Sequence, residues 1–129
     1  MTAVSTVKVM VVEDYDSMRA LMRRCLEGLG FTNIRTARSP IEALSSARRD
    51  PVDLIISDYD MPGMNGLQFL ESVRGHPEMR DIRFIMLSGS GDREVVRQAV
   101  ALGVDEYLVK PIGPLAVKEM VKRLFGELT

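Results

Sequence analysis

The sequence predicts an α/β protein with a doubly wound, five-stranded parallel sheet and five helices. Short apolar runs rich in β-branched residues alternate along the chain with amphipathic segments whose apolar residues recur every three or four positions. Strands that are joined through helices run parallel, and right-handed crossovers place the helices on both faces of the sheet. No internal repeat or linker divides the 129 residues, so we expect one domain over residues 1–129 and no attached second domain.

Each strand and helix is indicated by a local pattern. Strands are expected at residues 7–12, 54–58, 84–87 and 106–109, where apolar runs stop at polar or breaker residues. A short second strand is expected at residues 33–37. Helices are expected to begin near residues 16, 40, 65, 92 and 114. Ser39-Pro40-Ile41-Glu42 has the pattern of a capping box with proline at the first helical position, and Asn65 is paired with Gln68 in the same way. The apolar face of the last helix is expected to extend to Leu128.

Composition narrows the classes of function. The chain is 46% hydrophobic and 27% charged with a net charge of −1, which argues against a nucleic-acid-binding surface or a polybasic membrane patch. No apolar run approaches the ~18 residues of a membrane span, and the first residues lack a signal-peptide pattern. The single cysteine, Cys25, excludes an intramolecular disulfide and suits a reducing compartment. We therefore expect a cytoplasmic protein that neither binds nucleic acid nor inserts into a membrane.

Polar side chains lie at the ends of four of the five predicted strands. Glu13 and Asp14 follow the first strand, Asp58 ends the third, Ser88 follows the fourth and Lys110 the fifth. The carboxyl ends of parallel strands share one edge of the sheet, so these side chains are expected to meet there. Three carboxylates in one small site repel one another unless a cation neutralises them. Oxygen ligands without histidine or cysteine favour Mg²⁺.

The same edge is suited to a tetrahedral anion. A metal on one side, the Lys110 ammonium on another and a hydrogen bond from the Ser88 hydroxyl would together hold a phosphoryl group. Asp58 lies between them and is the candidate nucleophile, which would accept the group as an acyl phosphate. Taken singly, the acids fit a helix N-terminus, the serine a turn and the lysine a solvated strand end. Their coincidence at four strand ends favours a common site.

The motifs at this edge resemble those of a known family. Residues 57–66, Ser-Asp-Tyr-Asp-Met-Pro-Gly-Met-Asn-Gly, together with Glu13-Asp14, Ser88-Gly89, Tyr107 and Lys110-Pro111, resemble the receiver domains of two-component response regulators, particularly the single-domain chemotaxis regulators of the CheY type. The resemblance covers nearly the whole chain and implies a flavodoxin-like, CheY-like sheet with strand order 2-1-3-4-5. Glu13, Asn65 and Ser88 stand where aspartate, aspartate and threonine are commoner, and none of these departures removes a required functional group.

The resemblance implies an acceptor and a metal site. Asp58 would be phosphorylated by the phosphohistidine of a histidine kinase. Mg²⁺ would be bound directly by Asp14, Asp58 and the backbone carbonyl of Asp60, with Glu13 acting through metal-bound water. Such a protein catalyses its own phosphorylation and dephosphorylation without being a conventional multiple-turnover enzyme.

The resemblance also implies a switch. Ser88 and Lys110 would hold the phosphoryl oxygens, and the peptide bond from Lys110 to Pro111 would be cis. Ser88 and Tyr107 would change the signalling surface when Asp58 is phosphorylated. A downstream protein, such as a flagellar switch or another effector, would then bind that surface.

Several alternatives remain open. The chain fits a chemotaxis regulator, a phosphorelay intermediate, a phosphate sink or a degenerate receiver that serves only as an interaction module. A phosphatase resembling the haloacid dehalogenases could use Asp58-Tyr59-Asp60, but that family carries its nucleophile on the first strand, where this chain has Glu13-Asp14, and the chain is too short for the usual cap. The protein is expected to be a monomer or a phosphorylation-dependent dimer. Charged residues available for a dimer are Arg93, Arg97, Asp105, Glu106, Lys118 and Lys122.

Overall fold

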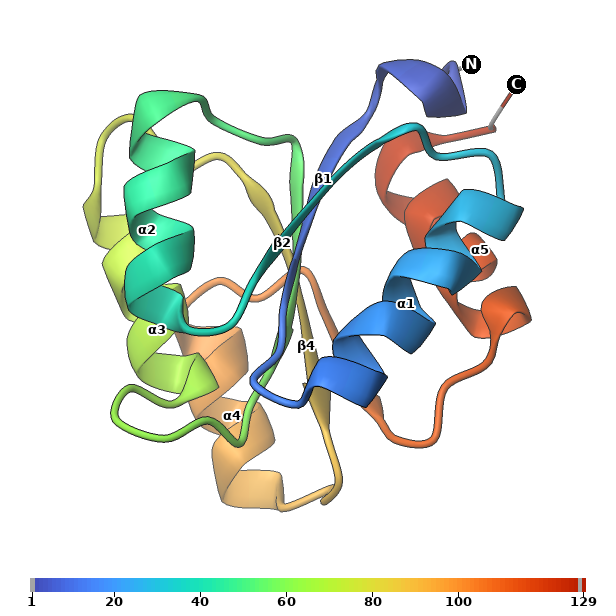
Figure 1. Cartoon of the computed structure of the whole chain (residues 1–129). Helices are drawn as coiled ribbons and strands as arrows, with labels where there is room; N and C mark the ends of the chain where they lie inside the picture. Colours follow the sequence, from blue (N-terminus) through green and yellow to red (C-terminus); the bar gives the residue numbers. More distant parts are fainter. Residues whose placement is uncertain (1, 128) are drawn as a thin grey trace.

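The computed structural model describes residues 2–127 and 129, which form a five-stranded parallel sheet (Figure 1). The strands are β1 (Lys8–Val12), β2 (Asn33–Ala37), β3 (Leu54–Asp58), β4 (Arg83–Ser88) and β5 (Glu106–Val109). Their spatial order is β2-β1-β3-β4-β5, and all neighbouring pairs are parallel. The predicted fold class and strand order are therefore confirmed.

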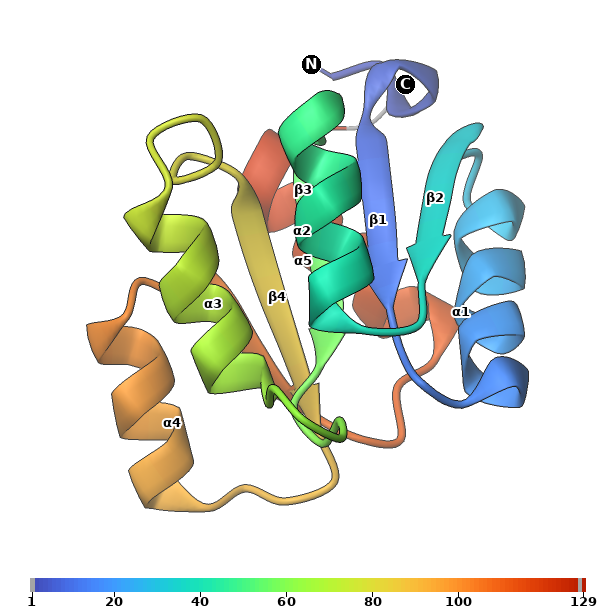
Figure 2. The same cartoon turned by 60° about the vertical axis from the view of Figure 1, so that its left-hand side comes forward.

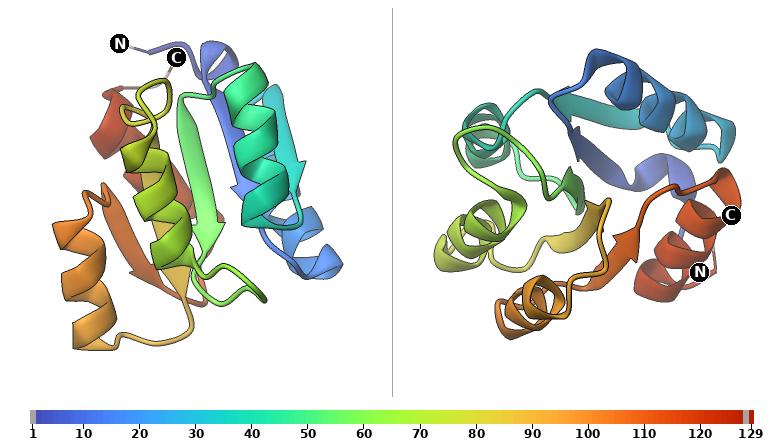
Figure 3. Two further views of the ribbon diagram at one scale, coloured as in Figure 1. Left: turned by 90° about the vertical axis from the view of Figure 1, so that its left-hand side faces the viewer. Right: turned by 90° about the horizontal axis from the view of Figure 1, so that it is seen from below.

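Within the described residues, five α-helices cover the two faces of the sheet. They are α1 (Asp16–Gly28), α2 (Pro40–Arg49), α3 (Gly66–Gly75), α4 (Arg93–Ala101) and α5 (Pro114–Phe125). Helices α1 and α5 lie on one face, whereas α2, α3 and α4 lie on the other (Figures 2 and 3). A short 3₁₀ helix, Val4–Thr6, precedes β1 and was not predicted. Within the described residues, no helix is both long enough and apolar enough to cross a membrane.

The helix starts follow from the capping residues in the sequence. Ser39 Oγ accepts a hydrogen bond of 3.2 Å from the Glu42 N–H, with proline at the first position of α2. Asn65 and Gln68 form a reciprocal capping box at α3, with two bonds of 2.9 Å. Each bond satisfies a backbone or side-chain group that the helix would otherwise leave unpaired. The predicted caps at α2 and α3 are therefore confirmed.

The last helix is shorter than its apolar pattern predicts. It ends at Phe125, and Gly126 adopts a positive φ of 83° directly after it. Glycine enters this region without steric cost and so commonly ends a helix. The expected apolar position Leu128 lies outside the described residues. The Thr2 N–H donates to the Glu127 carbonyl at 2.7 Å, which brings the two ends of the chain together (Figure 1).

The core consists of two apolar layers separated by the sheet. Side chains alternate along β1, so that Met10 and Val12 enter the layer beneath α2 to α4, while Val9 and Val11 enter the layer beneath α1 and α5. β3 is buried at every position. Strands buried on both faces leave polar groups little room except at the strand ends, where Asp58 lies.

Strand register places the predicted site residues side by side. Val12 is paired with Ser57, so the next residues, Glu13 and Asp58, are neighbours at the carboxyl edge. Gly66 at the start of α3 lets the loop after β3 approach closely: a Cβ there would lie 2.8 Å from Tyr59 Cα and 2.9 Å from the Asp58 carbonyl oxygen. The glycine therefore allows α3 to pack directly beneath the residue that carries the candidate nucleophile.

Candidate functional site

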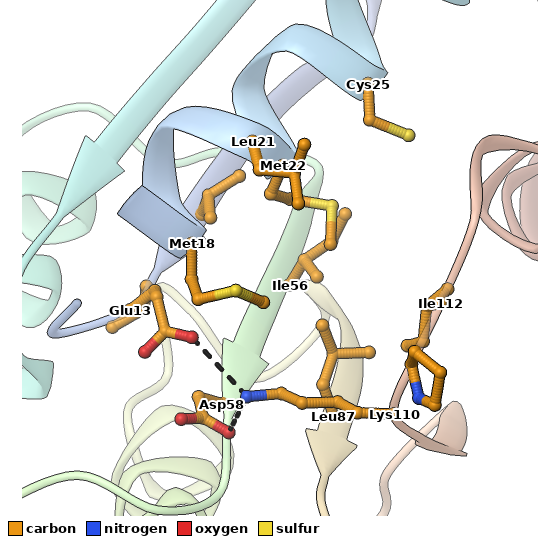
Figure 4. A pocket seen from close by; sticks show the side chains of 13 residues that line it. Glu13, Met18, Leu21, Met22, Cys25, Ile56, Asp58, Leu87, Lys110 and Ile112 are labelled. Carbon is orange, nitrogen blue, oxygen red and sulfur yellow. Dashed lines mark hydrogen bonds and ion pairs between the residues drawn. The ribbon is translucent and has the colours of Figure 1, made fainter. Parts of the chain in front are cut away.

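Three predicted site residues from three strand ends point toward one another at the carboxyl edge (Figure 4). The Lys110 Nζ atom lies 2.9 Å from Asp58 Oδ1 and 3.5 Å from Glu13 Oε1. Asp58 is 4% exposed and Glu13 is 6% exposed. The Lys110 ammonium group thus bridges two buried acidic side chains. The sequence predicts that these three residues meet at one edge of the sheet, but it does not predict this bridging contact.

A carboxylate cluster beside this lysine fits a divalent cation. Glu13, Asp14 and Asp58 each offer an oxygen, and these three oxygens lie within 4.8 Å of one another. Asp14 Oδ1 is buried and has no hydrogen-bond partner among residues 2–127 and 129. A buried carboxylate oxygen without a partner is costly, and a hard cation satisfies it. The donor set, which contains oxygen only, fits Mg²⁺.

Asp60 lies apart from the cluster. It is exposed on the loop between β3 and α3, and its carboxylate is not among the three clustered acids. The ligand expected from Asp60 is its backbone carbonyl oxygen. That role stays a prediction.

The two predicted switch residues contact the same loop residue. Ser88 is 2% exposed at the end of β4, and its Oγ accepts a hydrogen bond of 3.1 Å from the Ser90 N–H. The Tyr107 hydroxyl donates to the Ser90 carbonyl, also at 3.1 Å. Ser88 and Tyr107 are therefore linked through the backbone of Ser90.

The fifth strand separates the lysine from the tyrosine. Tyr107 packs against the apolar layer beneath α2 to α4, whereas Leu108 packs against the layer beneath α1 and α5, and Lys110 lies in a pocket on the α1 side. The peptide bond between Lys110 and Pro111 is cis, as the family resemblance implies.

Burial and mutual repulsion set the charge of the acids. Burial, followed by the negative charge of Asp58, raises the pKa of Glu13 to about 7, against the smaller opposing effect of Lys110. Burial alone would lower the pKa of Lys110, but its contacts with Asp58 and then Glu13 outweigh that effect and raise the pKa. Without a metal, the cluster therefore holds its lysine charged while Glu13 retains its proton to near-neutral pH.

We predict that Glu13→Gln stabilises the metal-free protein above pH 7. Because the pKa of Glu13 is raised from 4.5 to about 7 on folding, its favourable contribution is fully present below about pH 4.5 and is lost as the pH rises to about 7. Glutamine carries no charge, so at pH 8 the substitution is expected to raise the free energy of unfolding by an amount on the order of 2 kcal/mol. Urea unfolding in chelator at pH 5 and pH 8 measures it, and saturating Mg²⁺ should shrink the difference. A Glu13→Gln protein less stable than the native protein at pH 8 in chelator would contradict this account.

Two contacts at the site were not predicted from the sequence. Arg19 Nη1 donates to the Glu13 backbone carbonyl at 3.0 Å, and the buried Ser57 hydroxyl donates to the Asp58 carbonyl at 3.0 Å. The spacing of Asp16 and Arg19 does signal an ion pair on the first turn of α1. No sequence signal shows which backbone carbonyl a side chain will reach, so both contacts required the structure.

An apolar pocket of about 130 Å³ adjoins the charged residues (Figure 4). It lies between α1 and the segment after Lys110, and Met18, Leu21 and Ile112 form part of its wall. Glu13, Asp58 and Lys110 line it as well. The charged edge of the site is therefore continuous with an apolar, partly open surface of α1.

The charges expected to support a dimer are partly bound within the chain. Asp105 accepts hydrogen bonds from Arg74 at 3.0 Å, from Arg83 at 3.4 Å and from the Phe84 N–H at 2.8 Å. Glu106 pairs with Arg123. Asp105 therefore ties β4 to the start of β5, and it is not a free surface charge.

Fold and site together are those of a response-regulator receiver. The protein-family model described as "Response regulator receiver domain" matches residues 9–122. The chain belongs to this family. The family match, together with the acid pair after β1, argues against a dehalogenase-like phosphatase.

Within the family, the chain is similar to CheY proteins over nearly its whole length. It is 34% identical to the "Probable chemotaxis protein CheY" of Rhizobium etli over 99% of both chains. It is 31% identical to the "Chemotaxis protein CheY-3" of Vibrio cholerae over 94% of this chain and 93% of the relative. The structure of the Vibrio cholerae chemotaxis protein CheY4 superimposes with a TM-score of 0.86 at 30% identity, covering 97% of this chain and 100% of the other. The chain is thus a CheY-like receiver domain.

Proposed function

We propose that the chain accepts a phosphoryl group on Asp58 from the phosphohistidine of a histidine kinase, in the cytoplasm, and signals through a surface that changes on phosphorylation. The observation that carries this proposal is the placement of Asp58. Its carboxylate lies at the end of β3, 2.9 Å from the Lys110 ammonium and in one cluster with Glu13 and Asp14. A buried carboxylate, an ammonium group and an acidic cluster that could hold a divalent cation lie within one small volume, which supports this assignment.

The transfer is a single displacement at phosphorus. An Asp58 oxygen attacks, the bond between phosphorus and the donor imidazole nitrogen breaks, and the imidazole leaves with the electron pair and is then protonated. The Lys110 ammonium, already 2.9 Å from Asp58, stabilises negative charge on a phosphoryl oxygen. The Ser88 oxygen accepts a hydrogen bond from the Ser90 N–H, so the Ser88 hydroxyl proton would be available to donate to another phosphoryl oxygen.

Mg²⁺, when bound, neutralises the acids and the phosphoryl oxygens during transfer. Asp14 and Asp58 would hold it directly, Glu13 through water and Asp60 through its carbonyl. Two of these acids, Glu13 and Asp58, are more than nine-tenths buried, so the ionised form of Glu13 is disfavoured beside Asp58 until a cation binds.

Phosphoramidate, a small donor with a phosphorus–nitrogen bond, tests the proposal without a cognate kinase. With Mg²⁺ present, intact-mass spectrometry should show the addition of one phosphoryl group. Hydroxylamine should remove that group, because an acyl phosphate reacts with it and a phosphoserine or phosphotyrosine does not. A stable, hydroxylamine-resistant adduct would contradict the assignment to a carboxylate.

The output is proposed to be a protein contact, as the CheY-like similarity supports. A flagellar switch or another effector would bind the phosphorylated form. Two other outputs, a phosphorelay step and a phosphate sink, predict instead that the group passes to a second histidine or is lost by hydrolysis. Pull-down with beryllofluoride-treated and untreated protein discriminates these: a partner retained only by the treated form supports the effector role.

We predict that Ser88→Ala uncouples Tyr107 from the occupancy of Asp58. Beryllofluoride, a phosphoryl mimic, should shift the ring resonances of both Tyr59 and Tyr107 in the native protein. In Ser88→Ala, Tyr59 beside Asp58 should still shift, while the Tyr107 shift should be largely lost because the connection through Ser90 is broken. Tyr59 therefore serves as an internal control for binding. Equal Tyr107 shifts in both proteins would show that Tyr107 is not coupled to Asp58 through Ser88 and Ser90.

A further inference from the structure

The connection between β1 and α1 carries two of the three clustered acids. The Glu13 N–H donates to the Ala37 carbonyl at 3.1 Å, which continues the pairing of β1 with β2 by one residue. Helix α1 then begins at Asp16, with Tyr15 as an N-cap whose side chain makes no capping bond. In the described part of the chain, the peptide group between Glu13 and Asp14 makes no hydrogen bond to other backbone groups.

Arg19 supplies the contact that this peptide otherwise lacks. Its side chain is only 14% exposed, and Nη1 donates to the Glu13 carbonyl at 3.0 Å. The other end of the guanidinium pairs with the Asp16 carboxylate and holds the pKa of that group below its usual value. Because the peptide group is planar, fixing the Glu13 carbonyl also restricts the direction in which the Asp14 side chain leaves the backbone.

We propose that Arg19 is a positioning residue of the metal site. It touches neither the metal nor the phosphoryl group, and it holds the peptide between Glu13 and Asp14 so that both carboxylates face Asp58. The proposal rests on the proposed function, which assigns Mg²⁺ to this cluster. Groups that orient metal ligands from outside typically contribute about 10–100-fold in affinity. The buried, unpartnered Asp14 Oδ1 is the atom that a rotated peptide would misplace.

Removing the Arg19 side chain has two opposite effects on the affinity of the acidic cluster for Mg²⁺, one from its charge and one from its hydrogen bond. Loss of a positive charge near three carboxylates, which also frees the negative charge of Asp16, strengthens the binding of a cation by Coulomb's law. Loss of the hydrogen bond to the Glu13 carbonyl weakens binding, because the ligands must be ordered when the metal arrives. The sign of the change in affinity therefore distinguishes a positioning role from a merely electrostatic one.

Mg²⁺ titration of the metal-free protein, followed by amide NMR at Glu13, Asp14 and Asp58, measures this directly without any phosphorylation. Tryptophan is absent from the chain, so NMR replaces fluorescence as the reporter. Arg19→Ala is expected to weaken binding about tenfold. Arg19→Lys, which keeps the charge and one donor, should recover a large part of that loss.

Arg23→Ala is the matched control, since Arg23 is exposed on the same helix. It should leave the affinity unchanged or slightly tighter. Thermal unfolding in chelator checks that each variant folds. If Arg19→Ala does not fold, the test falls to Arg19→Lys, which must then bind Mg²⁺ more weakly than the native protein while unfolding at a similar temperature.

Two failures are distinguishable. If the native protein shows no shifts at the clustered acids on Mg²⁺ addition, the proposed metal site fails and the role of Arg19 fails with it. If the native protein binds there and Arg19→Ala binds equally well or more tightly, only the positioning role is overturned.

Discussion

Asp58→Asn is expected to abolish phosphoryl acceptance from phosphoramidate or a kinase. The substitution keeps the shape of the side chain and removes the nucleophilic oxygen, and losing a nucleophile typically costs many orders of magnitude in rate, on the order of 10⁶-fold in one protease. The protein should remain folded, because one of two mutually repelling buried carboxylates is neutralised. Intact-mass spectrometry over a time course measures the incorporation.

Asp60→Asn is the matched control for this prediction. It alters an exposed acid two residues away and retains the backbone carbonyl that is the expected ligand. It should still accept one phosphoryl group, and only the lifetime of the phosphorylated protein should change. Incorporation in Asp58→Asn at the native rate would place the acceptor elsewhere.

Removal of Mg²⁺ should have an effect of similar size. Excess chelator is expected to stop phosphoryl acceptance, because no divalent cation then offsets the negative charge of the acidic cluster and of the incoming phosphoryl group. Readdition of Mg²⁺ should restore the rate, and Mg²⁺ should also raise the melting temperature, since a ligand that binds only the folded state stabilises it.

Circular dichroism in chelator provides the control for that experiment. The expected spectrum is that of the folded protein, because the apolar layers on both faces of the sheet do not involve the metal. Undiminished transfer in excess chelator would refute the catalytic role of the metal. Unfolding in chelator would identify a structural site instead.

Much of the fold was predictable because local signals agree with the global arrangement. The strands Leu54–Asp58 and Glu106–Val109 lie where their apolar runs place them, and the capping residues Ser39 and Asn65 set the starts of α2 and α3. The last helix was predicted too long, because an apolar stripe does not reveal that Gly126 adopts a left-handed conformation and ends it.

The site was predictable as a set of residues and less so as a set of contacts. Parallel strands bring their carboxyl ends to one edge, so the meeting of Glu13, Asp58 and Lys110 follows from topology. The bridging position of the lysine, the bond from Arg19 to a backbone carbonyl and the anchoring of Asp105 by arginines depend on side-chain reach and carbonyl direction. Neither of these is encoded by residue spacing.

Mapping the modified residue after borohydride reduction tests the central claim most directly. Reduction converts an aspartyl phosphate to homoserine, which peptide sequencing by mass spectrometry locates to a single position. The account predicts homoserine at position 58 alone after treatment with phosphoramidate and Mg²⁺. Homoserine at position 14 or 60, or an unreduced phosphoester on Ser88, would contradict it.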